Sequence, residues 1–219
     1  VVSPDMDEDF VRLDEVERGT WVRKALGDQL FGATTPTYEY RGKTRRLSED
    51  LAELLGWYVA EGYTTERYME FEQHDIGNMA RFLQVGDSVF GPGSFYIPSA
   101  GATKALVSNA DAAEAIRSLL CLGTSAFKQV PRIIRAAPKR YQVAFLRSLF
   151  EGDGTVYHAN KGQNQCRVWT VEYCTISVDL ARQVKVMLDN LGIFSALRVG
   201  GVYRSNNHSH AKRVCTLHI

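Results

Sequence analysis

The 219-residue sequence lacks long apolar runs, paired cysteines and an appreciable net charge. No stretch approaches the roughly 18 apolar residues of a membrane span, so we expect no association with a membrane. The four cysteines form no CxxC pair, which excludes a zinc ribbon and favours reduced thiols inside a cell. The first residues are acidic rather than basic, which excludes a signal peptide and favours a cytoplasmic location.

Charge is segregated along the chain, although the net charge is only +1. Residues 1–20 hold seven acidic and two basic side chains, and residues 48–100 hold nine and two. The balance reverses to two and eight in residues 101–147, and to three and eight in residues 155–219. The second half therefore resembles a nucleic-acid-binding surface in composition, although ordinary solvated faces would give the same pattern.

Two nine-residue segments share one pattern. Residues 54–62 read LLGWYVAEG and residues 146–154 read LRSLFEGDG. Each is largely apolar, with small residues at its third and seventh positions, an acid at its eighth and glycine at its ninth. The two acids are Glu61 and Asp153, which lie 92 residues apart.

The small residues predict how the two segments meet. Residues four apart share one face of a helix, and small side chains there let two helix backbones approach closely. The predicted helix-interface residues are Gly56, Ala60, Ser148 and Gly152. If the two helices pack along these positions, their carboxyl ends come together and Glu61 lies beside Asp153.

Two carboxylates at the carboxyl ends of two helices repel each other and also face the negative ends of both helix dipoles. A divalent cation would compensate for this arrangement. Mg²⁺ suits it, because this ion takes oxygen ligands and completes its shell with water and substrate phosphate. Either segment alone would be read as an ordinary helix end with an adjacent acid. The two together favour a metal site, where the ion could activate a water and stabilise the leaving oxygen of a phosphodiester.

An apolar content of 45% is enough for a core, in one large domain or two small ones. We predict an extension at residues 1–46, a first half at 47–137 and a second half at 138–219. The extension contains a Pro/Thr-rich turn region at 34–38 and a basic linker at 41–46. Helices are expected at 49–60, 75–86, 111–121, 139–152 and 179–191. Strands are expected at 67–73, 94–97, 103–108, 167–175, 195–202 and 213–219.

Three local signals refine the two halves. Ser48 is a suitable N-cap for the first helix, and Gly62 is a suitable left-handed stop after it. Residues 79–81 (MAR) match residues 180–182 (LAR) at an offset of 101, which supports an internal duplication with pseudo-twofold symmetry. This offset is longer than the 92 residues between the two acids, so the second half carries extra residues after its acid. We expect them to form an extended hairpin at residues 158–165.

The two segments resemble the motif that names the LAGLIDADG homing endonucleases, and the similarity covers residues 47–219. It implies an α+β fold of two pseudo-symmetric half-domains, with a saddle-shaped antiparallel sheet and two central packed helices. It also implies a monomer that binds double-stranded DNA and cuts both strands with Mg²⁺, for which Mn²⁺ or Ca²⁺ can substitute in binding. Residues 21–30 (WVRKALGDQL) resemble the end of an intein splicing domain, which suggests an intein origin.

The resemblance also assigns residues to the site. Glu61 and Asp153 would be catalytic and metal-binding, and the backbone carbonyls of Ala60 and Gly152 would be further ligands. Lys128, in FKQVPRII, matches a family lysine ahead of the second motif, although an ordinary surface lysine would explain it equally well. The family's second lysine would fall after Ile219.

DNA contacts are expected on the saddle. The candidates are Lys104, Lys161, Arg167, Trp169, Arg198 and Arg204. Glu70 and Glu72 share one face of a predicted strand and would turn acidic groups toward DNA if that face belongs to the saddle.

Two other functions remain open. A degenerate LAGLIDADG protein could bind nucleic acid without cutting it, as an intein remnant or a maturase-like splicing cofactor. The chain could also be a structural piece of an intein whose function lies in other segments. The retained acids favour the endonuclease, whereas the missing second lysine and the acidic first half favour the alternatives.

Overall fold

The computed structural model describes residues 31–64, 69–120, 125–161, 166–203 and 212–219. For residues 159–161, 166–168, 201–203 and 212–213 only the backbone is described. Within these ranges no helix has the length and apolarity that a membrane span requires.

A short hairpin precedes the first half. It pairs β1 (Thr37–Tyr40) with β2 (Lys43–Arg46), in a region predicted as a turn and a linker. Arg41 and Gly42 have φ of 51° and 65°, the backbone of a tight two-residue hairpin turn. Tyr38 and Tyr40 alternate with exposed residues and are buried, and the Tyr40 hydroxyl donates to the Phe90 carbonyl at 3.0 Å. The prediction was wrong because it read the basic residues as a linker and overlooked this alternation.

The first half begins with helix α1 (Glu49–Glu61), which is capped as predicted by the Ser48 side chain. Helices α2 (Ile76–Phe90) and α3 (Ala110–Leu119) follow later in the chain. Strands β3 (Gly62–Thr64), β4 (Met69–Glu72), β5 (Phe95–Tyr96) and β6 (Lys104–Val107) form an antiparallel sheet in the order β3-β4-β6-β5.

The second half follows a short 3₁₀ turn, η2 (Ser125–Phe127), and the one-turn helix α4 (Arg132–Arg135). Its long helices are α5 (Lys139–Asp153) and α6 (Val178–Asn190). Strands β7 (Gly154–Lys161), β8 (Cys166–Thr175), β9 (Ala196–Tyr203) and β10 (Lys212–His218) form an antiparallel sheet in the order β7-β8-β10-β9.

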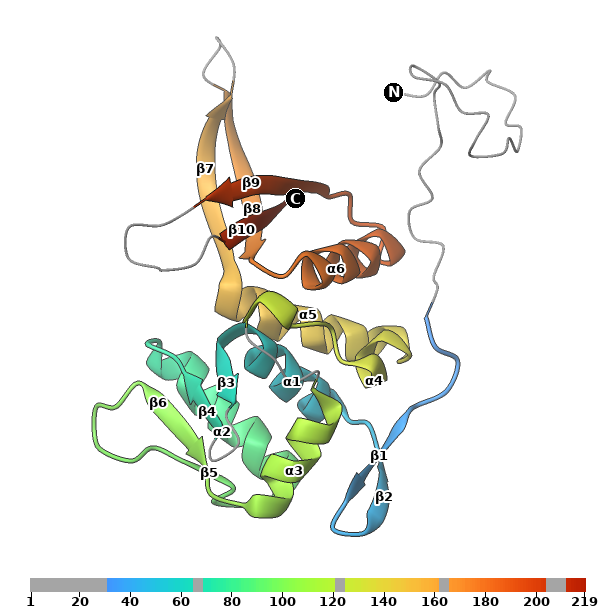
Figure 1. Cartoon of the computed structure of the whole chain (residues 1–219), viewed down its shortest axis with the longest axis vertical. Helices are drawn as coiled ribbons and strands as arrows, with labels where there is room; N and C mark the ends of the chain where they lie inside the picture. Colours follow the sequence, from blue (N-terminus) through green and yellow to red (C-terminus); the bar gives the residue numbers. More distant parts are fainter. Residues whose placement is uncertain (1–30, 65–68, 121–124, 162–165, 204–211) are drawn as a thin grey trace.

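The two sheets have the same strand order, and α1 and α5 pack side by side at the centre of the molecule (Figure 1). Helices cover one face of each sheet, α2 and α3 in the first half and α6 in the second, and leave the other face open (Figure 1). Strands β7 and β8 are longer than β3 and β4 and extend away from the rest of their sheet. The predicted fold class is therefore confirmed, with the saddle composed of two separate four-stranded sheets.

Gly62 has a different role from the predicted left-handed stop, and Gly154 has the same role in the second half. Gly62 has φ −78° and ψ 141°, and Gly154 has φ −85° and ψ 151°, so both are extended rather than left-handed. A Cβ on Gly62 would collide with the Tyr58 side chain and carbonyl, and one on Gly154 would collide with the Phe150 carbonyl. The chain therefore passes directly from helix into strand at both positions, and glycine is required for space.

Candidate functional site

Helices α1 and α5 are in contact along their small residues. A Cβ added to Gly56 would collide with the Ser148 hydroxyl and the Phe145 carbonyl, and one on Gly152 would lie 2.6 Å from Ala60 Cβ. The Ser148 hydroxyl donates to the Glu53 carbonyl across the interface at 2.7 Å. The four predicted interface residues are thus brought together, and backbone contact between the helices depends on their size.

The same packing brings the two helix ends together. Glu61 and Asp153 are the last residues of α1 and α5, and both are partly buried. Burial, and then the nearby charge of Asp153, raises the pKa of Glu61 above its usual range. Burial likewise raises the pKa of Asp153, while the positive charge of Lys128 opposes the shift. The two carboxyl groups therefore favour the protonated form more than free carboxylates do.

Lys128 lies at this site. Its ammonium donates to the Ala60 carbonyl at 2.9 Å, in the last turn of α1. Burial lowers the pKa of Lys128, and the charges of Asp153 and Glu61 counteract that shift. The structure thus joins the lysine, both acids and one of the two predicted carbonyl ligands in one place.

The backbone around Lys128 is held by the second half. The Ser177 hydroxyl donates to the Lys128 carbonyl at 2.6 Å, and the Val130 amide donates to Gln183 Oε1 at 2.8 Å. Ser177 is also the N-cap of α6, where it accepts from the Leu180 amide. Lys128 therefore links the start of α6 to the end of α1. Sequence reasoning missed Ser177 and Gln183, although a serine just before a predicted helix was visible as a cap.

The oxygen atoms at this site suit a hard divalent cation that takes further ligands from water and substrate. Two carboxylates and the adjacent backbone carbonyls are oxygen donors, which Mg²⁺ prefers. In the described part of the chain no cluster of three or more His, Cys, Asp or Glu side chains could hold a metal ion. The residues therefore fit an ion that takes the rest of its shell from water and phosphate oxygens, rather than a fully enclosed structural metal.

A buried carboxylate paired with two exposed arginines also joins the halves. Glu53 of α1 is 4% exposed and accepts two hydrogen bonds from Arg81 of α2, both at 2.8 Å, and one from Arg147 of α5 at 2.9 Å. Burial would raise the pKa of Glu53, but the hydrogen bonds and charge of Arg81, together with the charge of Arg147, hold it below its usual value. Sequence reasoning did not find this cluster.

We expect Glu53→Gln to lower the free energy of unfolding by about 2 kcal/mol, because an amide cannot satisfy two guanidinium groups at a buried position. Urea unfolding monitored by circular dichroism would measure the loss. Glu49→Gln, at an exposed acid in the first turn of the same helix, should cost about 0.5 kcal/mol through the helix dipole alone. Equal losses in the two variants would contradict a special role for the buried carboxylate.

The predicted DNA contacts are distributed unevenly over the described sheets. Arg198 is exposed on β9, opposite Thr216 of β10. Trp169 is 68% exposed on β8, with its ring 3.7 Å from that of His158. Side chains alternate along a strand, so Trp169 projects from the same face of β8 as buried Tyr173. Trp169 is exposed because β7 and β8 extend beyond the core at this point.

Three other candidates cannot be placed as side chains. Lys161 ends β7 and Arg167 lies near the start of β8, but only their backbone is described, and Arg204 lies outside the described residues. Lys104 is placed and is engaged with acids: its ammonium lies 2.9 Å from Glu70 Oε1 and 3.6 Å from Glu72 Oε2. As predicted, Glu70 and Glu72 share the face of β4 opposite buried Met69 and Phe71.

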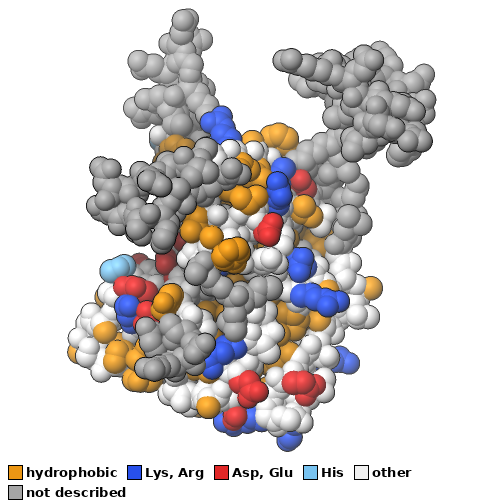
Figure 2. Space-filling view, viewed as in Figure 1, with side chains coloured by type: hydrophobic (Ala, Val, Ile, Leu, Met, Phe, Trp, Pro, Cys, Tyr) orange, Lys and Arg blue, Asp and Glu red, His pale blue; other side chains and the backbone are white. Residues whose placement is uncertain are grey.

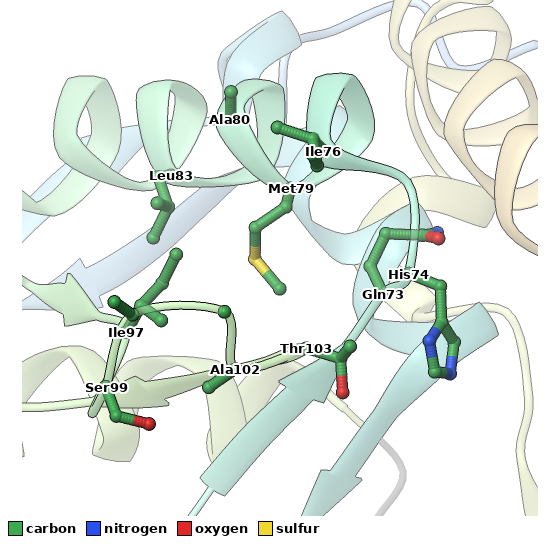
Figure 3. Close-up of a pocket in the computed structure, with 12 residues that line it drawn as sticks. Gln73, His74, Ile76, Met79, Ala80, Leu83, Ile97, Ser99, Ala102 and Thr103 are labelled. Carbon is green, nitrogen blue, oxygen red and sulfur yellow. The ribbon is translucent and has the colours of Figure 1, made fainter.

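A separate cavity of about 610 Å³ lies between α2 and the loop that connects β5 to β6 (Figure 3). Met79, Leu83 and Ile97 point into it, and Gln73, His74 and Thr103 are at its rim (Figure 3). None of Glu61, Asp153 and Lys128 lines this cavity, so it is distinct from the candidate site.

Residues 140–217 match the LAGLIDADG-like domain family. The matched range begins in α5 and ends in β10, so it includes Asp153 and not the first motif. The second half of the chain is therefore similar to a LAGLIDADG-like domain, in accord with the resemblance of its sequence motif.

Two curated relatives are similar to most of this chain. A DNA polymerase of Thermococcus litoralis is 25% identical over 171 residues, which cover 73% of this chain and 9% of the polymerase. A DNA gyrase subunit of Mycobacterium gordonae is 29% identical over 148 residues, which cover 65% of this chain and 26% of the gyrase polypeptide. The chain thus spans only a small part of the length of either relative.

One solved structure supports the fold. A structure of mesophilic variants of the homing endonuclease I-DmoI superposes with a TM-score of 0.50 and 15% identity, covering 77% of this chain and 84% of that one. At this identity the similarity shows a shared fold alone.

Proposed function

We propose that the chain is a site-specific endonuclease of the LAGLIDADG type, which hydrolyses both strands of a long DNA duplex with a divalent metal. The observation that carries the proposal is the meeting of Glu61 and Asp153 at the ends of two packed helices, with Lys128 hydrogen-bonded to the last turn of α1. The LAGLIDADG-like domain in residues 140–217 supports the same reaction class.

In this proposal Glu61 and Asp153, with the carbonyl oxygens of Ala60 and Gly152, would hold Mg²⁺. Their carboxyl groups have raised pKa values because of burial and, for Glu61, the charge of its neighbour, so a bound cation would relieve an unfavourable charge distribution. The ion would supply an activated water and would stabilise the leaving oxygen of the phosphodiester. Mn²⁺ or Ca²⁺ could occupy the same oxygen ligands in binding.

Lys128 would offset phosphate charge and polarise the attacking water. A buried ammonium interacts strongly with charge, because little water screens it. Its loop is fixed to α6 by Ser177 and its side chain reaches α1, so its position depends on both halves. This makes Ser177 a positioning residue for Lys128.

The open faces of the two sheets would form the DNA-binding saddle of a monomer with internal pseudo-twofold symmetry. Arg198 is exposed on the open face, and we retain Lys161, Arg167 and Arg204 as further contacts. Trp169 projects from the opposite face of β8, so it would reach DNA only from the extension of β7 and β8 and not from the saddle face. Such residues would anchor the phosphate backbone or contact base edges. Lys104 would join them only if it left its carboxylate partners.

An intein origin is part of the proposal. The similar regions occupy 9% of a DNA polymerase and 26% of a gyrase polypeptide, in accord with an endonuclease carried inside a longer host protein. We assign residues 1–46 to an N-terminal extension, 47–137 to the first half and 138–219 to the second. Within the extension, the β1–β2 hairpin contacts the first half through Tyr40 and through Arg41, which pairs with Asp111 at 2.8 Å.

The function can be tested with a plasmid library of genomic fragments from strains that lack the insertion. We expect the protein with Mg²⁺ to linearise a specific subset of plasmids, and EDTA to prevent this, because the hydrolysis requires the metal. Sequencing of the linear ends would identify the target.

The same assay separates the alternatives. Retarded plasmid fragments in a gel-shift experiment, without cleavage in Mg²⁺ or Mn²⁺, would instead support a LAGLIDADG protein that binds nucleic acid and does not cut. If the protein neither bound nor cleaved the plasmids, both of these functions would be contradicted. The structural role in an intein would then remain.

A further inference from the structure

The open face of the first sheet carries a compact charge cluster next to the candidate site. Lys104 of β6 lies between Glu70 and Glu72 of β4, with its ammonium 2.9 Å and 3.6 Å from their carboxylate oxygens. The hydrogen bond to Glu70, and then the charges of both acids, raise the pKa of Lys104. Figure 2 shows acidic and basic side chains gathered over this sheet, on the left of the molecule.

Strand register identifies the corresponding positions in the second sheet. Phe71 pairs with Gly62 in the first sheet, and Tyr173 pairs with Gly154 in the second. The residues before and after them are therefore equivalent, which matches Glu70 with Glu172 and Glu72 with Cys174. The pair formed by Glu72 and Lys104 then corresponds to the pair formed by Cys174 and Thr216.

The second sheet neutralises its carboxylate without using a lysine. Glu172 accepts from the Tyr157 hydroxyl at 2.8 Å and from the Cys174 thiol at 3.1 Å, and His218 Nδ1 lies 3.5 Å away. The two halves thus share an acidic position on the open face. Only the first half adds a second carboxylate there and places a lysine between the two.

We propose that Glu70 and Glu72 restrain Lys104 from contacting DNA phosphates, so that the first sheet holds a duplex weakly. This inference rests on the proposed DNA-binding function. A phosphate contact by Lys104 would require the loss of two ion pairs and would leave two carboxylates beside the DNA backbone. A DNA phosphate would therefore compete with the carboxylates of Glu70 and Glu72, which the strand register holds close to the Lys104 ammonium.

The restraint has a use in target selection. Lysine–phosphate contacts supply affinity that does not depend on sequence. Holding back one such contact lowers binding to all duplexes by the same factor and leaves the ratio of target to non-target affinity unchanged. At protein concentrations that still saturate the target, Glu70 and Glu72 would therefore reduce occupancy of non-target DNA.

The test compares duplex binding by wild type, Glu70→Gln/Glu72→Gln, and the same double variant with Lys104→Met. The probe is a fluorescein-labelled duplex of mixed sequence in a calcium buffer, measured by anisotropy over a series of KCl concentrations. We expect the double variant to bind roughly 3–10-fold more tightly and its salt dependence to steepen by about one phosphate contact. Adding Lys104→Met should remove most of this gain.

The controls separate release of a lysine from simple loss of negative charge. Glu172→Gln removes the equivalent carboxylate, which is near Arg198 rather than a lysine, so its effect should be the same with or without Lys104→Met. A gain that persists in full after Lys104→Met would show plain charge repulsion and overturn the proposal, as would no gain at all. Failure of the wild type and of every variant to bind the duplex would instead contradict the DNA-binding function itself.

Discussion

Replacing Asp153 by Asn should slow cleavage of at least one DNA strand by about 10³-fold or more, while duplex affinity in calcium changes only a few-fold. Asp153 ends α5 beside Glu61, and among the residues that the structure describes no third His, Cys, Asp or Glu side chain forms a metal-binding group with these two. An amide of the same shape keeps the packing but loses the charge that a metal needs. Nicking of a supercoiled plasmid that carries the target, followed on a gel, measures each strand.

The matched control is Glu151→Gln, an exposed acid two residues earlier on the same helix, which should cleave at the wild-type rate. Glu61→Gln should give the complementary defect, because Glu61 occupies the equivalent position on α1. If both motif variants cut both strands at the wild-type rate, the assignment of the two acids to catalysis is wrong.

Asp153→Asn, which should impair cleavage, should increase the stability of the metal-free protein. Because folding raises the pKa of both acids, their contribution to stability is fully present at low pH and is lost as the pH rises through the carboxyl range. At neutral pH without metal, Asp153→Asn should therefore raise the melting temperature by roughly 2–4 °C. Saturating Mg²⁺, at about 100 times its Kd, should stabilise the wild type by about 2.7 kcal/mol and the variant much less. Thermal melts across pH, with and without Mg²⁺, measure both effects.

Gly56→Ala should lower the free energy of unfolding by about 2–3 kcal/mol, or roughly 4–12 °C in melting temperature. Helix propensity alone predicts the opposite, since alanine stabilises a helix by about 0.5–1 kcal/mol over glycine. At position 56, however, the new methyl group meets the Phe145 backbone carbonyl and the Ser148 hydroxyl, and the carbonyl cannot move unless α5 moves. The shift would also separate Glu61 from Asp153, so cleavage should fall with stability.

Gly77→Ala makes the same chemical change in the first turn of α2, where the nearest atom to the new methyl group is the Asp75 side-chain oxygen at 3.1 Å. This variant should be neutral or slightly more stable in the same urea titration. Equal changes at the two glycines would mean that the contact between α1 and α5 tolerates a methyl group, against the close packing described above.

Sequence reasoning succeeded where the signal was local or repeated. Ser48 was predicted as a cap, and α1 begins beside it. The pairing of α1 with α5 was also predictable, because small residues four apart recur ahead of both acids. A backbone contact needs those residues on both helices, so the pattern constrains which helix faces meet.

Other features depend on distances along the chain that no local pattern encodes. Lys104 meets Glu70 through strand register, 34 residues away, and Ser177 meets Lys128 across 49 residues. The β1–β2 hairpin was hidden by basic residues that resemble a linker, and its two tyrosines became informative only once their burial was seen. Gly62 was misread because helix ends usually favour glycine for its conformation, whereas here the requirement is space.

The hydrogen bond between Lys128 and Ala60 gives the two central helices different carboxyl ends. Both helices lie wholly within the described residues, and neither has a basic residue in its last turn. Lys128 compensates the exposed carbonyl dipoles at the end of α1, 68 residues before it in the chain. The hydrogen bond therefore distinguishes the ends of the two helices, while the charge of Lys128 acts on both Asp153 and Glu61. Under the proposed function, the two strands of a bound duplex would then meet unlike helix ends.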